Sequence, residues 1–254
     1  MADTYHIGLN KGDVPKIMLL PGDPARAEYI SKFFDNPRKL AQNREFTTFV
    51  GSYKGVPIGV TSTGIGGPSA AIAVEELIQV GADTFIRVGT AGSLQPHVKL
   101  NDLVVVSGAV REDGTSRQYV PISFPAVADI DVMDALRLSA RDKGYQYHIG
   151  LAHVKDAFYI EEPADIPIGV DLEKKWEFWK KAGVLATSME SASIFVVAQI
   201  RGCKAGTVLV AVGETAEGEP FSDIDTTPGT NNAITCALEA AVRLHEAGDE
   251  GVLK

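Results

Sequence analysis

Residues 57–90 read PIGVTSTGIGGPSAAIAVEELIQVGADTFIRVGT. A short apolar run leads into a glycine-rich turn, a helical pattern follows, and a second apolar run reaches Gly89. Pro68 marks the start of the helix and Gly81 its end, because proline is favoured in a first helical turn and glycine just past the last one. The apolar face of this helix consists of Ile72, Val74, Leu77 and Ile78. The stretch therefore predicts a strand, a turn, a helix and a strand in succession.

Apolar runs of the same kind occur elsewhere, as KIMLLPG at 16–22 and GTVLVAVG at 206–213. They hardly alternate between apolar and polar side chains, which is typical of strands covered on both faces. Because helical patterns such as 188–201 separate them, we expect an α/β protein with a parallel or mixed sheet. No composition break divides the chain, so we expect one domain over 1–254. In such sheets ligands bind at the carboxyl ends of the strands.

The composition argues against several classes of function. The 254 residues carry a formal net charge of −9, whereas a protein that binds nucleic acid needs a basic face. Cys203 and Cys236 indicate neither a disulfide framework nor a thiolate metal site. The five histidines show no metal-ligand spacing on a helix. Since the sequence shows neither a signal core nor a membrane-length apolar run, we expect a cytoplasmic protein with no membrane partner.

The turn GIGGPS at 64–69 invites comparison with the dinucleotide-binding pattern G-x-G-x-x-G. Ser69 stands at the third glycine position, and the nearby acid, Asp83, precedes the next strand instead of following it. A nicotinamide-dependent dehydrogenase is therefore a weak alternative. The sequence also shows neither the G-x-S-x-G of a serine hydrolase nor a P-loop with its lysine.

The segment PGDPAR at 21–26 predicts a helix start with Asp23 as the N-cap and Pro24 at the first position. Arg26 then lies in the first turn, where the helix dipole disfavours a cation. Either Asp23 neutralises this charge or an anion lies between Arg26 and the exposed N–H groups. The second alternative predicts that Arg26 becomes ordered when phosphate binds.

Two more arginines stand at unusual places. Arg87 interrupts an apolar strand, where an arginine is costly unless it is paired, and Arg44 lies in NREFTTF. Singly, these arginines suit a structural salt bridge or a surface position. Taken with the glycine turns and a helix N-terminus, they favour an oxyanion or phosphate site.

Glu190, in LATSMESASIF, allows two interpretations. Thr187 and Glu190 have the spacing of a capping box at a helix start. Alternatively, the two carboxylate oxygens of Glu190 bind a vicinal diol. Glu214, at the end of an apolar strand, is either a solvated loop acid or a carboxylate aimed into the site.

Nine segments, in order from residue 6 to 193, resemble the nucleoside phosphorylase-I family, and within it the uridine phosphorylases most. They are HIGL, PGDPAR, REFTTF, STGIGGPS, AVEEL, RVGTAGSLQP, FPAVAD, DAFY and MESAS. The resemblance implies a three-layer α/β/α fold around a mixed, partly barrel-like sheet. It also implies a homo-oligomer in which a dimer is the active unit and dimers form a hexamer.

The resemblance further implies roles for individual residues, with Arg87, Glu190 and Arg26 as the catalytic groups. The phosphate site would consist of Gly22, Arg26, Arg87 and Thr90, with Arg44 supplied by the neighbouring subunit. The nucleoside would contact Met189, Glu190 and Phe158, and His6 of the neighbour would reach its 5′-hydroxyl. Glu45, Ile65 and Ser69 would hold a structural monovalent cation such as potassium. Inorganic phosphate would be the co-substrate, with no organic cofactor.

One departure from that family concerns the base. A glutamine and an arginine that read and stabilise uracil in uridine phosphorylases are replaced here by Glu162 and Ala164. An ionised glutamate accepts hydrogen bonds but repels a departing uracil anion. Either another group recognises a pyrimidine, or the base is a purine that an acid such as Glu214 protonates. Ser188 also replaces the first glutamate of the family's EMES.

From the residues and the resemblance we expect reversible phosphorolysis of a nucleoside, uridine first, to base and ribose 1-phosphate. A purine nucleoside phosphorylase is the main alternative. A phosphate-independent nucleosidase and a non-catalytic nucleoside-binding protein are weaker ones.

Overall fold

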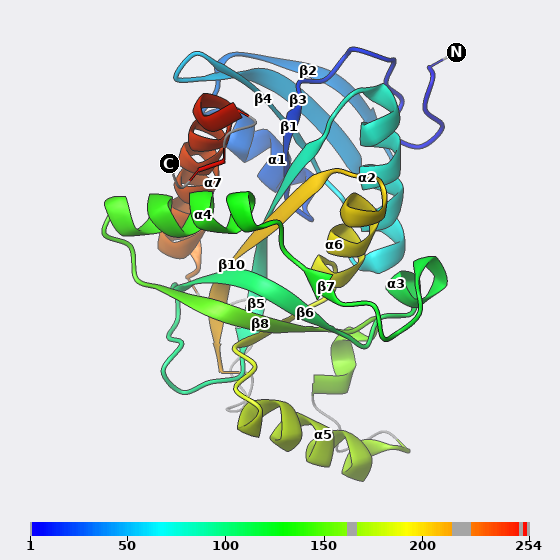
Figure 1. Ribbon diagram of the computed structural model, residues 1–254, viewed down its shortest axis with the longest axis vertical. Helices are drawn as coiled ribbons and strands as arrows, with labels where there is room; N and C mark the ends of the chain where they lie inside the picture. Colours follow the sequence, from blue (N-terminus) through cyan, green and yellow to red (C-terminus); the bar gives the residue numbers. More distant parts are fainter. Residues whose placement is uncertain (1, 162–166, 215–224, 249–250, 253–254) are drawn as a thin grey trace.

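A computed structural model describes residues 2–161, 167–214, 225–248 and 251–252 (Figure 1). The strands are β1 (Ile17–Leu20), β2 (Asp35–Asn43), β3 (Phe46–Tyr53), β4 (Val56–Thr61), β5 (Thr84–Ser93), β6 (Leu103–Arg111), β7 (Ala126–Val127), β8 (Tyr147–Val154), β9 (Ala186–Ser188) and β10 (Lys204–Glu214). The α-helices are α1 (Pro24–Ser31), α2 (Gly67–Val80), α3 (Gly114–Tyr119), α4 (Ile130–Asp142), α5 (Gly169–Lys181), α6 (Ser191–Ile200) and α7 (Thr227–Ala247), and a 3₁₀ turn, η1, spans Phe158–Glu161.

The strands form one mixed sheet that is partly closed into a barrel. Its order is β10-β6-β8-β9-β5-β1-β4-β3-β2, and β10 also pairs with β5. This extra pairing joins the two ends of the series β10-β6-β8-β9-β5, so these strands enclose a barrel while β1, β4, β3 and β2 continue as an open sheet. The fold predicted from the sequence, a mixed and partly barrel-like α/β sheet, is confirmed.

Helices cover both faces of the sheet, each over its own hydrophobic core (Figure 1). Helices α2 and α6 pack with Met18 and Phe85 on one side. Helices α1, α4 and α7 pack with Leu19 and Ile86 on the other. Neighbouring residues of β1 and β5 thus enter opposite cores, as the two-residue period of a strand requires. The continuous apolar runs of the sequence follow from this burial on both faces.

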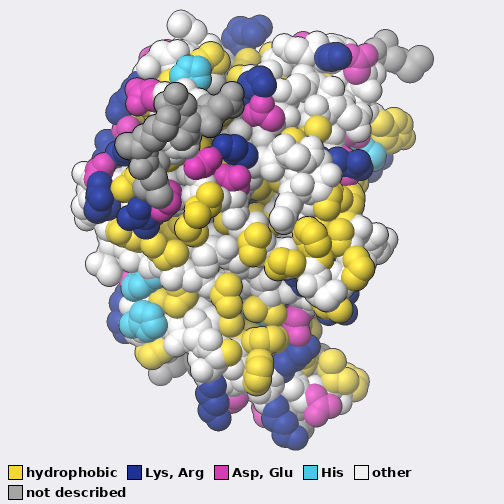
Figure 2. Space-filling model, viewed as in Figure 1, with side chains coloured by type: hydrophobic (Ala, Val, Ile, Leu, Met, Phe, Trp, Pro, Cys, Tyr) yellow, Lys and Arg dark blue, Asp and Glu magenta, His cyan; other side chains and the backbone are white. Residues whose placement is uncertain are grey.

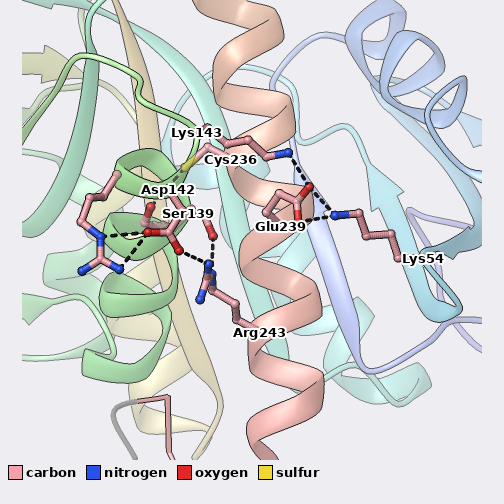
Figure 3. Close-up of polar contacts among 9 residues, drawn as sticks. Lys54, Ser139, Asp142, Lys143, Cys236, Glu239 and Arg243 are labelled. Carbon is pink, nitrogen blue, oxygen red and sulfur yellow. Dashed lines mark hydrogen bonds and ion pairs between the residues drawn. The ribbon is translucent and has the colours of Figure 1, made fainter.

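Ionic contacts join α7 to the end of α4 and to the β3–β4 turn (Figure 3). Arg243 of α7 binds Asp142 of α4, and its Nε also donates to Ser139. Glu239 of α7 binds both Lys54 and Lys143. Within the described residues, no helix combines the length and the apolar character needed to cross a bilayer.

The helix boundaries follow the sequence signals with one exception. Asp23 caps α1 through a bond from Ala25 N to its carboxylate (2.8 Å), and Gly81 ends α2 with a left-handed φ of 119°. The helix predicted from residue 188 instead begins at Ser191. Residues 186–188 form β9, which pairs with both β5 and β8. Ser188, which the sequence pattern assigned to the helix, therefore belongs to the sheet.

Candidate active site

A cavity of about 790 Å³ opens where β1, β4, β5 and β8 end at their carboxyl ends. Its wall includes Gly22, Arg26, Glu45, Ile65, Arg87, Thr90, Phe158, Met189 and Glu190, all of which the sequence singled out. These residues span most of the chain, and the sheet brings them together because its adjacent strands end at one edge.

Arg26 and Arg87 share one end of this cavity. Burial of the Arg26 guanidinium and the neighbouring Arg87 cation lower the pKa of Arg26, while Asp23 opposes the shift. Across the described residues the structure shows no hydrogen bond or ion pair to the Arg26 side chain. Asp23 caps α1 through one carboxylate oxygen. Its charge favours the Arg26 cation without a direct ion pair among the described residues, so the Asp23 alternative holds only as a partial compensation.

Arg87 is 4% exposed and projects from the middle of β5. Its Nη2 is ion-paired with the carboxylate of Glu190. In the described part of the chain, Nε and Nη1 are buried without a hydrogen-bond partner. A buried donor without a partner is costly, so these two nitrogens and Arg26 together offer an unsatisfied positive site to an anion.

Glu190 lies between the arginine end and the rest of the cavity. Its Oε1 accepts from Gly66 N (2.8 Å) and its Oε2 from Met189 N (3.2 Å), in addition to the Arg87 contact. It precedes α6 without capping that helix through its side chain, and Thr187 belongs to β9. The capping-box interpretation is therefore wrong, because the strand pairing of Thr187 removes it from the helix start.

The glycines of GIGGPS bring the backbone close to two acidic side chains, Glu45 and Glu190. Gly64 and Gly66 have φ angles of 69° and 87°, which favour glycine. A Cβ on Gly64 would lie 2.7 Å from Glu45 Cγ. The N–H of Gly66 donates to the Glu190 carboxylate. It therefore does not point toward a dinucleotide phosphate, as the dehydrogenase alternative requires.

Arg44 and His6 do not line the cavity of their own chain. Arg44 is exposed in the β2–β3 turn, with a left-handed φ of 52°. His6 contacts Glu76 through Nδ1 (2.6 Å) and is tied to the same corner by a bond from Asn43 Nδ2 to its carbonyl (2.7 Å). The structure thus places the two side chains near each other and outside the cavity.

The three residues considered for a cation are only partly together. Ser69 Oγ lies 2.7 Å from Glu45 Oε1 and 2.5 Å from the Thr63 carbonyl. The hydrogen bond from Ser69 is the largest cause that lowers the pKa of Glu45. Ile65 is 77% exposed at the cavity mouth. Among the described residues there is no cluster of three histidine, cysteine or acidic side chains arranged for a metal.

Three positions tied to base recognition lie outside what the structure describes. Glu162 and Ala164 fall in the undescribed range 162–166. Glu214 is the last residue of β10, and its side chain is also outside the described part.

Sequence reasoning missed Lys155, noted Thr187 only as part of a capping box and noted Ser188 only as a substitution; all three line the cavity. Ser188 Oγ is buried with no hydrogen-bond partner in the described residues. Lys155 is 2% exposed and donates to Thr187 Oγ1 (2.9 Å). One signal was available, because Lys155 directly follows the strand that ends at Val154.

A buried polar chain lies behind this wall. His153 Nε2 is 2.7 Å from Glu112 Oε2, and Lys175 Nζ is 2.5 Å from Glu112 Oε1. Burial raises the pKa of Glu112, but the hydrogen bonds from His153 and Lys175 outweigh this effect and lower it from 4.5 to about 2. Glu112 is therefore ionised at neutral pH.

Comparison with known proteins gives consistent matches. Residues 16–245 match the phosphorylase superfamily. The chain is 44% identical to a uridine phosphorylase of Treponema pallidum over 238 residues, which cover 93% of this chain and 92% of the relative. It is 40% identical to a uridine phosphorylase of Escherichia coli over 251 residues, 96% and 98% of the two chains. It is also 39% identical to a guanosine phosphorylase of Halorubrum lacusprofundi over 218 residues, 86% of each.

Proposed function

This chain belongs to the phosphorylase superfamily, and from that membership we propose that it catalyses the reversible phosphorolysis of a nucleoside, with uridine favoured. The reaction transfers ribose from the base to phosphate, which makes the protein a pentosyltransferase. The observation that carries the proposal is the arginine pair: Arg26 and Arg87 line the cavity with Glu190, and two nitrogens of Arg87 have no hydrogen-bond partner among the described residues.

In this mechanism phosphate binds between the two guanidinium groups, near Gly22 and Thr90. An anion there relieves the repulsion between Arg26 and Arg87 and supplies acceptors to the buried nitrogens. The ribose lies against Met189 and Glu190, with its C1′ toward the phosphate. As the glycosidic bond breaks, positive charge develops on the sugar, and the adjacent phosphate stabilises it.

Glu190 contacts the ribose through its 2′- and 3′-hydroxyls. Its carboxylate already accepts from two backbone N–H groups and from Arg87, and these bonds fix its orientation. The hydroxyl of Ser188, which has no partner in the part of the chain that the structure describes, belongs to the same wall and provides a further hydrogen bond to the sugar. Phe158, which is 45% exposed at the cavity, packs against sugar and base.

The active unit is a dimer, and dimers assemble into a hexamer. Arg44 and His6 lie outside the cavity of their own chain, so a second copy places them in the site by symmetry. Arg44 keeps a left-handed φ of 52° that glycine adopts more easily, which supports a role for its side chain. Apolar side chains gather over the region of β6, β7 and β8 in Figure 2. The exposed apolar residues of these strands include Val127 of β7 and Leu151 of β8, each 43% exposed, as an interface requires.

A monovalent cation lies at the dimer interface, held by Glu45, Ser69 and the carbonyl of Ile65. The single hydroxyl hydrogen of Ser69 cannot serve both Glu45 and Thr63, so these oxygens form a set suited to a hard ion. The cation is structural and takes no part in the chemistry. The protein acts in the cytoplasm, in nucleoside salvage, where its free thiols Cys203 and Cys236 stay reduced.

The experiment compares Arg26→Met with Arg38→Met, a matched change at an exposed position of β2. We expect Arg26→Met to raise the KM for phosphate and lower kcat/KM on the order of 10²-fold, without loss of stability because a repulsive neighbour of Arg87 is removed. Arg38→Met keeps the activity. Normal phosphate affinity in Arg26→Met would refute the phosphate site.

The alternative substrate is a purine nucleoside, which the guanosine phosphorylase relative favours. Turnover of uridine, thymidine, inosine, guanosine and adenosine, each with and without phosphate, separates the candidates. Uridine turnover that requires phosphate supports the proposal. Base release without phosphate indicates a nucleosidase, and binding without turnover indicates a binding protein.

A further inference from the structure

Lys155 lies in the cavity wall and is held there by several contacts. Its Nζ donates to Thr187 Oγ1 (2.9 Å) and is 5.8 Å from the ring centroid of Trp176. Its backbone N–H donates to the Ser188 carbonyl (3.2 Å), which continues the pairing of β8 with β9. With 2% of its surface exposed, the ammonium group is a positive charge in a fixed place.

The hydrogen bonds behind Lys155 have one consistent direction. An ammonium group only donates, so Thr187 accepts from Lys155 and gives its own hydrogen to His153 Nδ1 (3.2 Å). His153 then carries its proton on Nε2 and donates to Glu112 (2.7 Å). This assignment follows from the charged groups at the two ends. The chain locks the Thr187 oxygen as the acceptor that positions Lys155.

Lys155 lies away from Arg87 along the wall, because its partner Thr187 pairs with Gly92 of β5, five residues beyond Arg87 on the same strand. Thr187 contacts Lys155, whereas Glu190, three residues later, contacts Arg87. The Cα atoms of Thr187 and Glu190 are at most about 10 Å apart, and the residues between them, Ser188 and Met189, line the cavity. A ligand with phosphate at the arginines and ribose at this segment therefore directs its base toward Lys155.

We propose that Lys155 binds a carbonyl oxygen of the departing pyrimidine and stabilises the negative charge that the base acquires. The inference rests on the proposed phosphorolysis. A phosphate oxygen forms a bond to C1′ while the C1′–N1 bond breaks, and its electron pair passes to N1 and the ring carbonyls. Lys155 keeps its proton throughout. The proton of the bound hydrogen phosphate passes through solvent to N1 of the released base, so charge and atoms balance.

The positive charge of Lys155 compensates for the loss of the base-binding arginine at position 164. Glu162 and Ala164 replace the pair that supports the uracil anion in similar enzymes, and neither supplies a cation. Preorganised donors stabilise developing charge strongly because they need no rearrangement during the reaction. Lys155 meets this requirement, since β8, β9 and Thr187 fix it before substrate binds.

The test compares Lys155→Met with Lys54→Met. The second change removes a lysine that binds Glu239 and does not line the cavity (Figure 3). Turnover is measured with uridine and with 5-fluorouridine, whose base leaves more readily as an anion. We expect Lys155→Met to lower kcat for uridine on the order of 10²-fold, to lower it clearly less for 5-fluorouridine, and to leave the KM for phosphate unchanged. Lys155→Arg restores part of the rate, and Lys54→Met behaves as wild type.

Equal losses with both nucleosides, or no loss, would overturn the proposal. If Lys155→Met does not fold, the ultraviolet spectrum of 5-fluorouracil bound to wild-type protein decides: a bound anion supports the proposal, and a bound neutral base overturns it. If wild-type protein phosphorolyses no nucleoside, the proposed function fails. The spectrum of the bound base still tests Lys155 by itself.

Discussion

Replacing Glu190 by glutamine tests whether the Arg87–Glu190 pair and bound phosphate depend on each other. The Glu190 side chain is 5% exposed and faces three donors: Gly66 N, Met189 N and Arg87 Nη2. Glutamine keeps the shape but loses the charge, and its NH₂ group meets donors where the carboxylate accepted. Leaving a buried charge without its partner costs about 3–5 kcal/mol. At roughly 2–4 °C per kcal/mol for a chain of this size, Tm falls by about 6–20 °C.

Phosphate should recover a large part of this loss. In Glu190→Gln the Arg87 cation lacks its carboxylate, so an anion bound at Nε and Nη1 stabilises the variant more than the wild type. Thermal unfolding without and with saturating phosphate measures the difference. We expect a larger phosphate-induced rise of Tm in Glu190→Gln, together with lower kcat/KM and a reduced preference for uridine over 2′-deoxyuridine.

The control is Glu239→Gln, which also disturbs a carboxylate with two cationic partners, Lys54 and Lys143 (Figure 3). It lies away from the cavity wall, so its phosphate-induced shift should equal that of the wild type. An equal shift in Glu190→Gln would refute the argument that phosphate and Glu190 share Arg87.

Three further predictions concern single residues. Arg44→Gly relieves a left-handed φ of 52°, so the unfolding free energy should hold or rise by about 1 kcal/mol while the KM for phosphate increases; unchanged kinetics would contradict a contribution of Arg44 to the neighbouring site. Because the fold lowers the pKa of Glu112 from 4.5 to about 2, the ionised Glu112 stabilises the fold above pH 4.5, and this contribution is lost as the pH falls toward about 2. The loss of stability between pH 5 and pH 3, measured by urea unfolding, should therefore be smaller in Glu112→Gln than in the wild type. Ser188→Ala removes a buried hydroxyl that has no partner in the described residues, so stability should not fall, whereas the KM for the nucleoside should rise; an unchanged KM would exclude the ribose contact.

Much of the fold was predictable from local sequence. The turn at Gly81 and the cap at Asp23 end and begin helices as their chemistry requires. The continuous apolar strands indicated a sheet covered on both faces, which the two cores confirm. The barrel closure through the β10–β5 pair came from the family resemblance, because a pairing between distant strands leaves no local signal.

The candidate site was predictable in its residues and less so in its contacts. Arg87 drew attention because a charge interrupted an apolar strand, and the structure buries it at 4% exposure. Glu190 allowed two interpretations of similar weight, since the spacing from Thr187 fits a capping box. The pairing of Thr187 with Gly92 in β5 excluded the capping box, and the diol contact of Glu190 stays a proposal. Lys155 was missed because its place after a strand was its single signal, and that place does not show that the side chain faces Thr187.

The sequence by itself determined the α/β class, the helix ends and the set of arginines, because residue type and spacing control local conformation and charge. Only the tertiary structure decided which charges meet. It joined Arg87 to Glu190, left Arg26 without an ion pair among the described residues, and set Lys155 against Thr187 in the same cavity wall. The physical reason is that electrostatic and hydrogen-bond energies depend on separation in space and on burial, and strand pairing sets both between residues far apart in the chain.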